Sequence, residues 1–203
     1  MEEISAAWRR IVQRFEIHAP SWLDLGGPHP LFRPPAPEEE LARLEARMRL
    51  ALPEQLRALL ESHDGCRANR YPLNMRATRP TNWRTMPTAE VADQWEMLSA
   101  IAAGTPLPST IQTVGPVQPV WWSAQWIPVF ECGMGDVICV DAAPAVSGHA
   151  GQLILYEHDF EERKVLYPSI LDWLREYAAD LERGEYVYID GLGVHHKDDR
   201  FDG

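Results

Sequence analysis

Three short apolar runs in the middle of the chain predict the centre of the fold. They cover residues 127–132, 137–140 and 153–156. The glycine-rich residues 133–136 join the first two, and glycine readily takes the backbone conformations that a tight turn requires. Residues 137–140 are apolar without alternation, which is typical of a strand covered on both faces. The pattern therefore predicts a β-meander at the centre of a sheet.

Apolar residues at helical spacing predict five helices. One covers residues 4–15, two follow Pro37 and Pro53, one begins at Thr88 and the last follows Ser169. The predicted buried stripes are Ile4, Trp8, Ile11 and Phe15; Leu41, Leu44 and Met48; Leu56, Leu59 and Leu60; Val91, Trp95 and Leu98; and Ile170, Leu174, Tyr177 and Leu181. Ser169 can cap the last helix, with Asp172 completing a box-like motif.

Short strands and two proline-rich loops fill the remaining sequence. We predict strands at residues 71–75, 163–167 and 185–189, and loops at 20–37 and 104–119. The first loop should lie on the core, because its apolar side chains need burial: Trp22, Leu23, Leu25, Leu31 and Phe32. The second loop is long enough to suggest a function.

The order of these elements predicts an α+β fold. Helices precede the strands and another helix follows them, without regular βαβ alternation. We expect a single domain over residues 1–190, with a mostly antiparallel mixed sheet and helices packed on one side. Residues 191–203 are predicted to be a polar C-terminal tail.

The distribution of charge narrows the choice of partners. The formal net charge is −11; residues 1–127 hold 14 acids and 13 bases, whereas residues 128–203 hold 16 acids and 6 bases. An acidic half repels phosphate and anionic lipid, so we expect no direct contact with nucleic acid or a membrane surface. A basic protein partner would be attracted.

Cysteine content and hydropathy indicate the cellular compartment in which the protein is expected. The three cysteines are Cys66, Cys132 and Cys139, a sparse and odd set that suits a reducing cytoplasm better than a disulfide framework. The N-terminal residues are charged throughout, and no apolar run approaches the ~18 residues of a membrane span. We therefore expect a cytoplasmic protein.

Several groups of reactive side chains were tested as catalytic or metal sites. His63, Asp64 and Cys66 could form a nucleophile and base, but Asp64-Gly65 is also an ordinary helix-ending turn. Cys132 and Cys139 lack the further ligands of a zinc site, so buried packing is the better interpretation. His195 and His196 with nearby aspartates, Asp198, Asp199 and Asp202, could chelate a metal loosely, although a flexible tail explains them better. We predict no catalytic residues, no metal and no cofactor.

Carboxylates and indoles near the meander are the best candidates for contact with a partner. Acidic side chains gather at the strand ends, either as a solvated rim or as a docking face for a basic protein. An exposed tryptophan beside them would suggest a binding hot spot, whereas core packing is the alternative. The predicted partner-binding residues are Trp122, Trp126, Glu131, Asp136, Asp141, Glu157, Asp159, Glu161 and Glu162.

Motifs along most of the chain resemble those of one protein family. Residues 41–45 (LARLE), 52–60 (LPEQLRALL) and 63–65 (HDG) are similar to the opening of the SUKH superfamily, in the branch named for the yeast cell-wall-assembly regulator. The later motifs follow in the order of that branch: Gly115-Pro116-Val117, Trp121-Trp122, Trp126-Ile127-Pro128, Gly135-Asp136, Asp141 with Pro144, Gly148, Gly151-Gln152 and Ser169. The resemblance covers residues 4–189.

This resemblance implies a non-enzymatic, cytoplasmic α+β protein. Many bacterial members look like immunity proteins that bind and neutralise a cognate toxin domain, often a basic nuclease, by occlusion. Fungal relatives act as scaffolds in cell-wall signalling. The resemblance therefore implies toxin neutralisation first, and a scaffold or regulatory binding module as the alternative. Oligomeric state is left open.

Overall fold

The described helices and strands follow most of the predicted pattern. The computed structural model describes residues 2–18, 31–68, 70–78, 82–104, 110–189 and 193–198. Its α-helices are α1 (Glu2–His18), α3 (Glu38–Met48), α4 (Glu54–Leu60), α5 (Thr88–Gly104) and α6 (Ile170–Glu182), with a short 3-10 helix at Arg76–Thr78. Its strands are β1 (Leu73–Asn74), β2 (Asn82–Thr85), β3 (Gln112–Val114), β4 (Trp126–Glu131), β5 (Val137–Asp141), β6 (Gln152–Tyr156), β7 (Glu162–Tyr167), β8 (Tyr186–Ile189) and β9 (Gly193–His196).

The meander forms the centre of a seven-stranded sheet. The strand order is β1-β2-β4-β5-β6-β7-β3, and every neighbouring pair is antiparallel except β3 with β7, which is parallel. All residues of β5 are buried, and the uninterrupted apolar sequence of residues 137–140 predicted this for four of the five. The predicted α+β fold with a mostly antiparallel mixed sheet is therefore confirmed.

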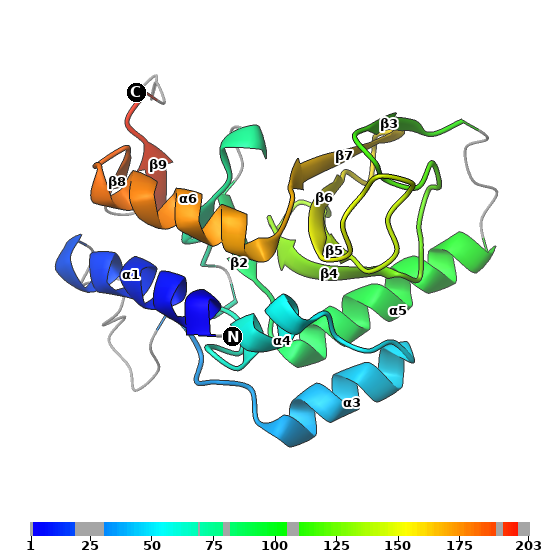
Figure 1. Cartoon of the computed structure of the whole chain (residues 1–203), viewed down its shortest axis with the longest axis horizontal. Helices are drawn as coiled ribbons and strands as arrows, with labels where there is room; N and C mark the ends of the chain where they lie inside the picture. The colour runs from blue at the N-terminus through cyan, green and yellow to red at the C-terminus, as the bar shows by residue number, and fades with distance from the viewer. Residues whose placement is uncertain are drawn as a thin grey trace.

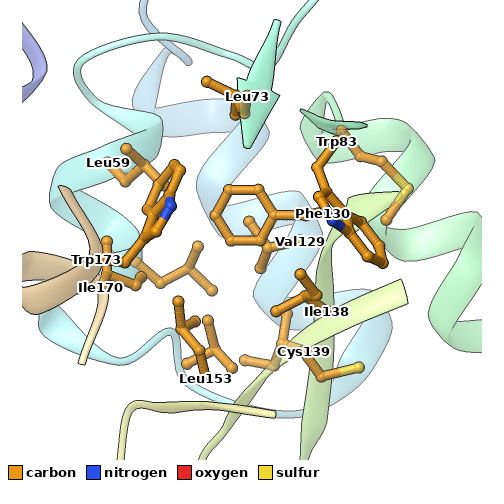
Figure 2. Close-up of a cluster of buried hydrophobic side chains, with 14 of the residues drawn as sticks. Leu59, Leu73, Trp83, Val129, Phe130, Ile138, Cys139, Leu153, Ile170 and Trp173 are labelled. Atoms are coloured by element: carbon orange, nitrogen blue, oxygen red, sulfur yellow. The ribbon is translucent and has the colours of Figure 1, made fainter. Parts of the chain in front are cut away.

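The helices pack in two groups around the sheet. Figure 1 shows α1 beside α6 at one end of the molecule and α3 beside α5 below the sheet. The helix α4 contacts both α1 and α6, and α5 packs against β4. Figure 2 shows how helix and sheet side chains meet in the core, where Phe130 of β4 faces Trp173 of α6. Their ring centroids are 4.9 Å apart in an edge-to-face arrangement, which adds to the stabilisation from burial.

The last helix begins as its sequence predicted. The Ser169 Oγ accepts a hydrogen bond from the Asp172 amide at 3.1 Å, which satisfies one of the free N–H groups of the first turn. Of the predicted stripe, Ile170, Leu174 and Tyr177 are buried and Leu181 is partly buried.

Three strands were not predicted where they occur. The strand β2 lies in a region that the sequence pattern left irregular, and β3 lies within the predicted loop of residues 104–119. The strand β9 pairs with β8, so residues 193–196 of the predicted tail form a hairpin. Each strand is short. The strands β2 and β3 exist because the distant strands β4 and β7 supply their hydrogen bonds, whereas β9 pairs with the preceding strand β8. Most of the first predicted loop, with Trp22, Leu23 and Leu25, lies outside the described residues; Leu31 and Phe32 are buried as expected.

Candidate partner-binding surface

A hollow of about 320 Å³ lies between α5 and the turn that joins β4 to β5. Four carboxylates and one guanidinium contribute to its wall, which gives these residues a formal charge of −3. The lining residues are Arg84, Met86, Glu90, Asp93, Gln94, Met97, Glu131, Gly135, Asp136 and Val137. The hollow is therefore acidic, with methionine and valine side chains as its apolar part.

One face of α5 supplies half of the acidic groups. Glu90, Asp93, Gln94 and Met97 recur at helical spacing, so they share a face of the helix. It is a different face from the one that carries Val91 and Leu98, which are buried as predicted; Trp95, the third predicted residue, is only partly buried. The helical spacing of these four residues could have predicted that they share a face, but only the fold places that face opposite the β4–β5 turn.

Arg84 joins the two walls of the hollow. It lies on β2, is 7% exposed and forms ion pairs with Glu90 of α5 and Glu131 of β4. Burial opposes the charged guanidinium, but the hydrogen bonds and negative charge of these two carboxylates outweigh burial and raise the pKa of Arg84. Glu131 also accepts a hydrogen bond from the Gly133 amide at 2.6 Å, which fixes the start of the turn.

The acidic surface continues from the hollow onto the turn between β6 and β7. Asp136 accepts hydrogen bonds from the His158 amide at 3.1 Å and from its imidazole at 2.8 Å. The exposed residues Asp159 and Glu161 follow in this turn, with Glu157 and Glu162 partly buried at its ends. Burial raises the pKa of Glu157, and the negative charges of Asp136 and Glu162 raise it further.

The side chain of Arg163 holds this acidic turn in place from the protein interior. Its side chain is fully buried and has no carboxylate partner among the described residues; instead it donates to main-chain carbonyls. Nη1 donates to Phe160 and Glu162 at 2.8 and 2.7 Å, and Nε donates to Trp121 at 3.1 Å. The guanidinium also lies 4.2 Å from the ring centre of Tyr156, which is a favourable cation–π distance.

We expect the pKa of the His158 imidazole to depend on its hydrogen bond to Asp136, which links the hollow to the turn. The hydrogen bond to Asp136 raises the pKa of His158 above its ordinary value of 6.5, so the small stabilisation it gives is complete below pH 6.5 and is lost as pH rises through the folded pKa. Substitution D136N should move the pKa of His158 back towards 6.5. Titration of the histidine ring signals by NMR measures both values, and an unchanged pKa in D136N would contradict this assignment.

The structure divides the predicted partner-binding residues. It brings six of them together around the hollow and the neighbouring turn: Glu131, Asp136, Glu157, Asp159, Glu161 and Glu162. Trp122, Trp126 and Asp141 lie elsewhere and are 8%, 0% and 0% exposed. A buried side chain cannot contact a partner on this surface, so the prediction is wrong for these three residues. Sequence analysis missed Arg84 and the acidic face of α5.

The three excluded residues support the fold. The Trp122 Nε1 donates to Ser99 of α5 at 3.0 Å, and its ring packs edge-to-face on Trp126. The Asp141 carboxylate accepts from the Ala143 amide at 3.1 Å and from the Gln152 side chain at 3.0 Å. Burial raises the pKa of Asp141, and these hydrogen bonds oppose that rise. Several motif residues of the resemblance are therefore structural.

The group His63, Asp64 and Cys66 has no access to a substrate. Cys66 is fully buried, and burial raises the pKa of its thiol to about 11, so a reactive thiolate is disfavoured. The Asp64 carboxylate accepts from the Thr88 amide at 2.8 Å, at the first residue of α5. This geometry favours the structural interpretation of the turn over catalysis.

The remaining sequence candidates are also accounted for. Cys132 and Cys139 are buried free thiols. Within the described ranges, no three His, Cys, Asp or Glu side chains are grouped so that they could hold a metal ion. Asp199 and Asp202 lie outside those ranges. None of the described helices is both long enough and apolar enough to cross a bilayer.

Together, the fold and the surface define an α+β domain with a mixed seven-stranded sheet and a hollowed acidic face. Comparison of sequences then gives the family. The chain belongs to the SMI1 / KNR4 family (SUKH-1), whose family model matches residues 35–176. The predicted resemblance to the cell-wall-assembly regulator branch of the SUKH superfamily is confirmed.

Curated relatives from fungi carry the names of regulators. The chain is 34% identical over 87 residues to "Cell wall assembly regulator SMI1" of Saccharomyces cerevisiae, which is 43% of this chain and 16% of that protein. It is 27% identical to "Cell wall biosynthesis/cell cycle regulator smi1" of Schizosaccharomyces pombe, over 71% of this chain and 30% of that protein. It is 24% identical to the "Glucan synthesis regulatory protein" of Neurospora crassa, over 90% of this chain and 39% of that protein. The matched region is thus less than half of each relative.

Proposed function

We propose that this chain is a non-enzymatic regulatory binding module that recognises a basic region of a partner protein. The observation that carries the proposal is the continuous acidic surface formed by the α5 hollow and the 157–162 turn. Asp136 joins the two parts, because it lines the hollow and also binds His158 of the turn. The fungal relatives support a regulatory role by their names.

Electrostatic complementarity explains how such a surface would act. Arg84 holds two carboxylates of the hollow, those of Glu90 and Glu131, and the buried Arg163 holds the main chain of the turn, so these parts of the surface are ordered before a partner arrives. Fixed charges of one sign speed the approach of an oppositely charged partner and exclude anionic ones. Lysine or arginine side chains could place their stems on Met97 and their charges on the carboxylates.

The relatives' names favour regulation over toxin neutralisation, which was the first function implied by the resemblance. Both functions would use a surface that binds a protein without transforming it. They differ in the partner, which is a host protein in one case and a toxin domain in the other. Rescue of growth by this chain against a toxin encoded beside its gene would favour neutralisation.

Reversing charge on the turn tests the proposal. We expect E161K/E162K to reduce recovery of the partner by at least about tenfold, because like charges brought together cost on the order of 1 kcal/mol or more. The measurement is quantitative cross-linking and recovery of the tagged chain from its own host.

The matched control is E2K/E16K on α1, which changes the net charge equally at exposed positions away from the acidic surface. The control should recover the same partners as the unmodified chain. Equal recovery with both double variants would reject this surface as the binding site.

A further inference from the structure

We infer that β3 is a docking edge to which a partner adds an extended, basic segment as a new strand. The inference rests on the proposed function and specifies how the partner is held. Figure 1 shows β3 at the outer side of the sheet, beside β7 and next to the acidic turn. The edge of a sheet offers unpaired main-chain N–H and C=O groups to another chain.

The two edge strands of the seven-stranded sheet, β1 and β3, differ in how far they are exposed. At one edge, both residues of β1 are buried, and β9 packs beside this strand. At the other edge, every residue of β3 is exposed, and among the described strands only β7 pairs with it. Among the described residues, β3 is therefore the more accessible of the two edges of this sheet.

The strand β3 is short, with three residues, but it lacks the other usual features that prevent strand addition. Natural edge strands are often protected by being very short, by charged side chains, by proline or by a bulge. The sequence of β3 is Gln112-Thr113-Val114, and its register with β7 is regular throughout. The exposed fraction of Val114 is 45%, so an apolar side chain is presented at this edge.

Contacts at both ends fix β3 on β7 before any partner binds. At its start, the Gln112 amide donates to the Glu161 carbonyl at 2.9 Å. At its end, Gly115 has φ +90°, and a Cβ at this position would lie 3.0 Å from the side chain of Val165. Because the edge is already ordered, less conformational entropy is lost when a partner strand pairs with it.

Thr113 carries the main-chain groups that a new strand would use. In a strand, the main-chain groups of successive residues point to opposite sides in the plane of the sheet, so neighbours of a residue bonded to β7 point outward. The amide of Gln112 bonds to β7, and the amide and carbonyl of Thr113 are therefore directed away from it.

The charges around β3 select a basic segment as the occupant. The acidic turn adjoins the start of the strand, with Asp159 and Glu161 exposed. The exposed fraction of Phe160, between them, is 62%, which provides an apolar surface for the stem of a lysine or arginine. A second copy of this chain is a poorer occupant, because two copies that each carry a formal net charge of −11 repel one another.

Two substitutions at Thr113 test whether binding depends on the outward main-chain amide, and neither of them changes the charge. T113P removes the outward amide while leaving the bonds of Gln112 and Val114 to β7, and proline is tolerated in edge strands. T113V keeps the amide and favours a strand. Both variants should unfold at nearly the same temperature as the unmodified chain, and thermal unfolding confirms that the fold is intact.

The probe is a short peptide of alternating lysine and valine, with a matched peptide N-methylated at every second residue. We expect the first peptide to slow hydrogen exchange of the Thr113 amide by roughly tenfold or more, and the methylated peptide not to do so. T113P should weaken binding by about tenfold or more, and T113V should not. Amide exchange and chemical-shift titration by NMR give these values.

Each other outcome overturns the inference in a distinguishable way. Binding that perturbs the acidic turn without protecting Thr113, and that survives T113P, would leave the acidic surface in place but reject strand addition. Protection of Thr113 that depends on protein concentration without peptide would identify a second copy as the occupant. Absence of binding by either peptide, together with a null result for E161K/E162K, would reject both proposals.

Discussion

Replacement of Arg163 with methionine should lower the free energy of unfolding by about 3 kcal/mol. The guanidinium donates to the carbonyls of Trp121, Phe160 and Glu162, and all three acceptors remain after the substitution. Hydrogen bonds that involve a charged group contribute roughly 1.5–3 kcal/mol each. Relief from burying a charge offsets part of this loss, because burial also lowers the pKa of Arg163. The lost hydrogen bonds should dominate.

Equilibrium unfolding in urea measures this effect, with the slope checked for two-state behaviour. R175M is the control, since Arg175 is an exposed arginine with a surface ion pair to Glu3 and should change stability by less than about 1 kcal/mol. R163K should resemble R163M, because a single ammonium cannot reproduce the planar fork that reaches separate carbonyls. A loss below about 1 kcal/mol in R163M would show that the turn is held by other contacts.

Acid should destabilise the fold through His63. The imidazole is buried against Trp8, with ring centroids 3.7 Å apart, and its Nε2 lies 2.9 Å from Thr85 Oγ1. Burial lowers the pKa of His63 from 6.5 to about 3. Between these pH values the unfolded chain binds a proton that the folded chain does not. Stability is therefore complete above pH 6.5 and falls by up to about 1.4 kcal/mol per pH unit below it.

The variant H63Q isolates this contribution, because glutamine can still reach Thr85 but does not titrate. We expect the stability difference between the unmodified chain and H63Q to shrink by about 2.5 kcal/mol from pH 6.5 to pH 4.5. The comparison uses the change with pH, so a constant loss from the missing ring does not affect it. Parallel stability curves for the two proteins would show that the folded state accepts a proton at His63.

The candidate site was predictable only where the chain itself brings residues together. The acidic residues of the 157–162 turn are neighbours in sequence, and Glu131 and Asp136 flank one tight turn, so their proximity follows from local structure. Trp126 and Asp141 sit at strand ends in the same way, yet both are buried. Their exposure depends on what packs against those ends: Trp122 packs on Trp126, and Gln152, which also binds the Pro116 carbonyl, binds Asp141. No local pattern encodes these contacts.

Hydrophobic periodicity and capping act over a few residues, so the helices, the meander strands and their buried faces follow from local sequence. Only the completed fold buries Arg163 and brings it the carbonyl of Trp121, which lies 42 residues away in the sequence. It also made Gln112–Val114 a strand by pairing it with β7, and it set the acidic face of α5 opposite the β4–β5 turn. The free energy of a polar or charged group depends on partners brought by distant segments, so its place follows from the completed fold.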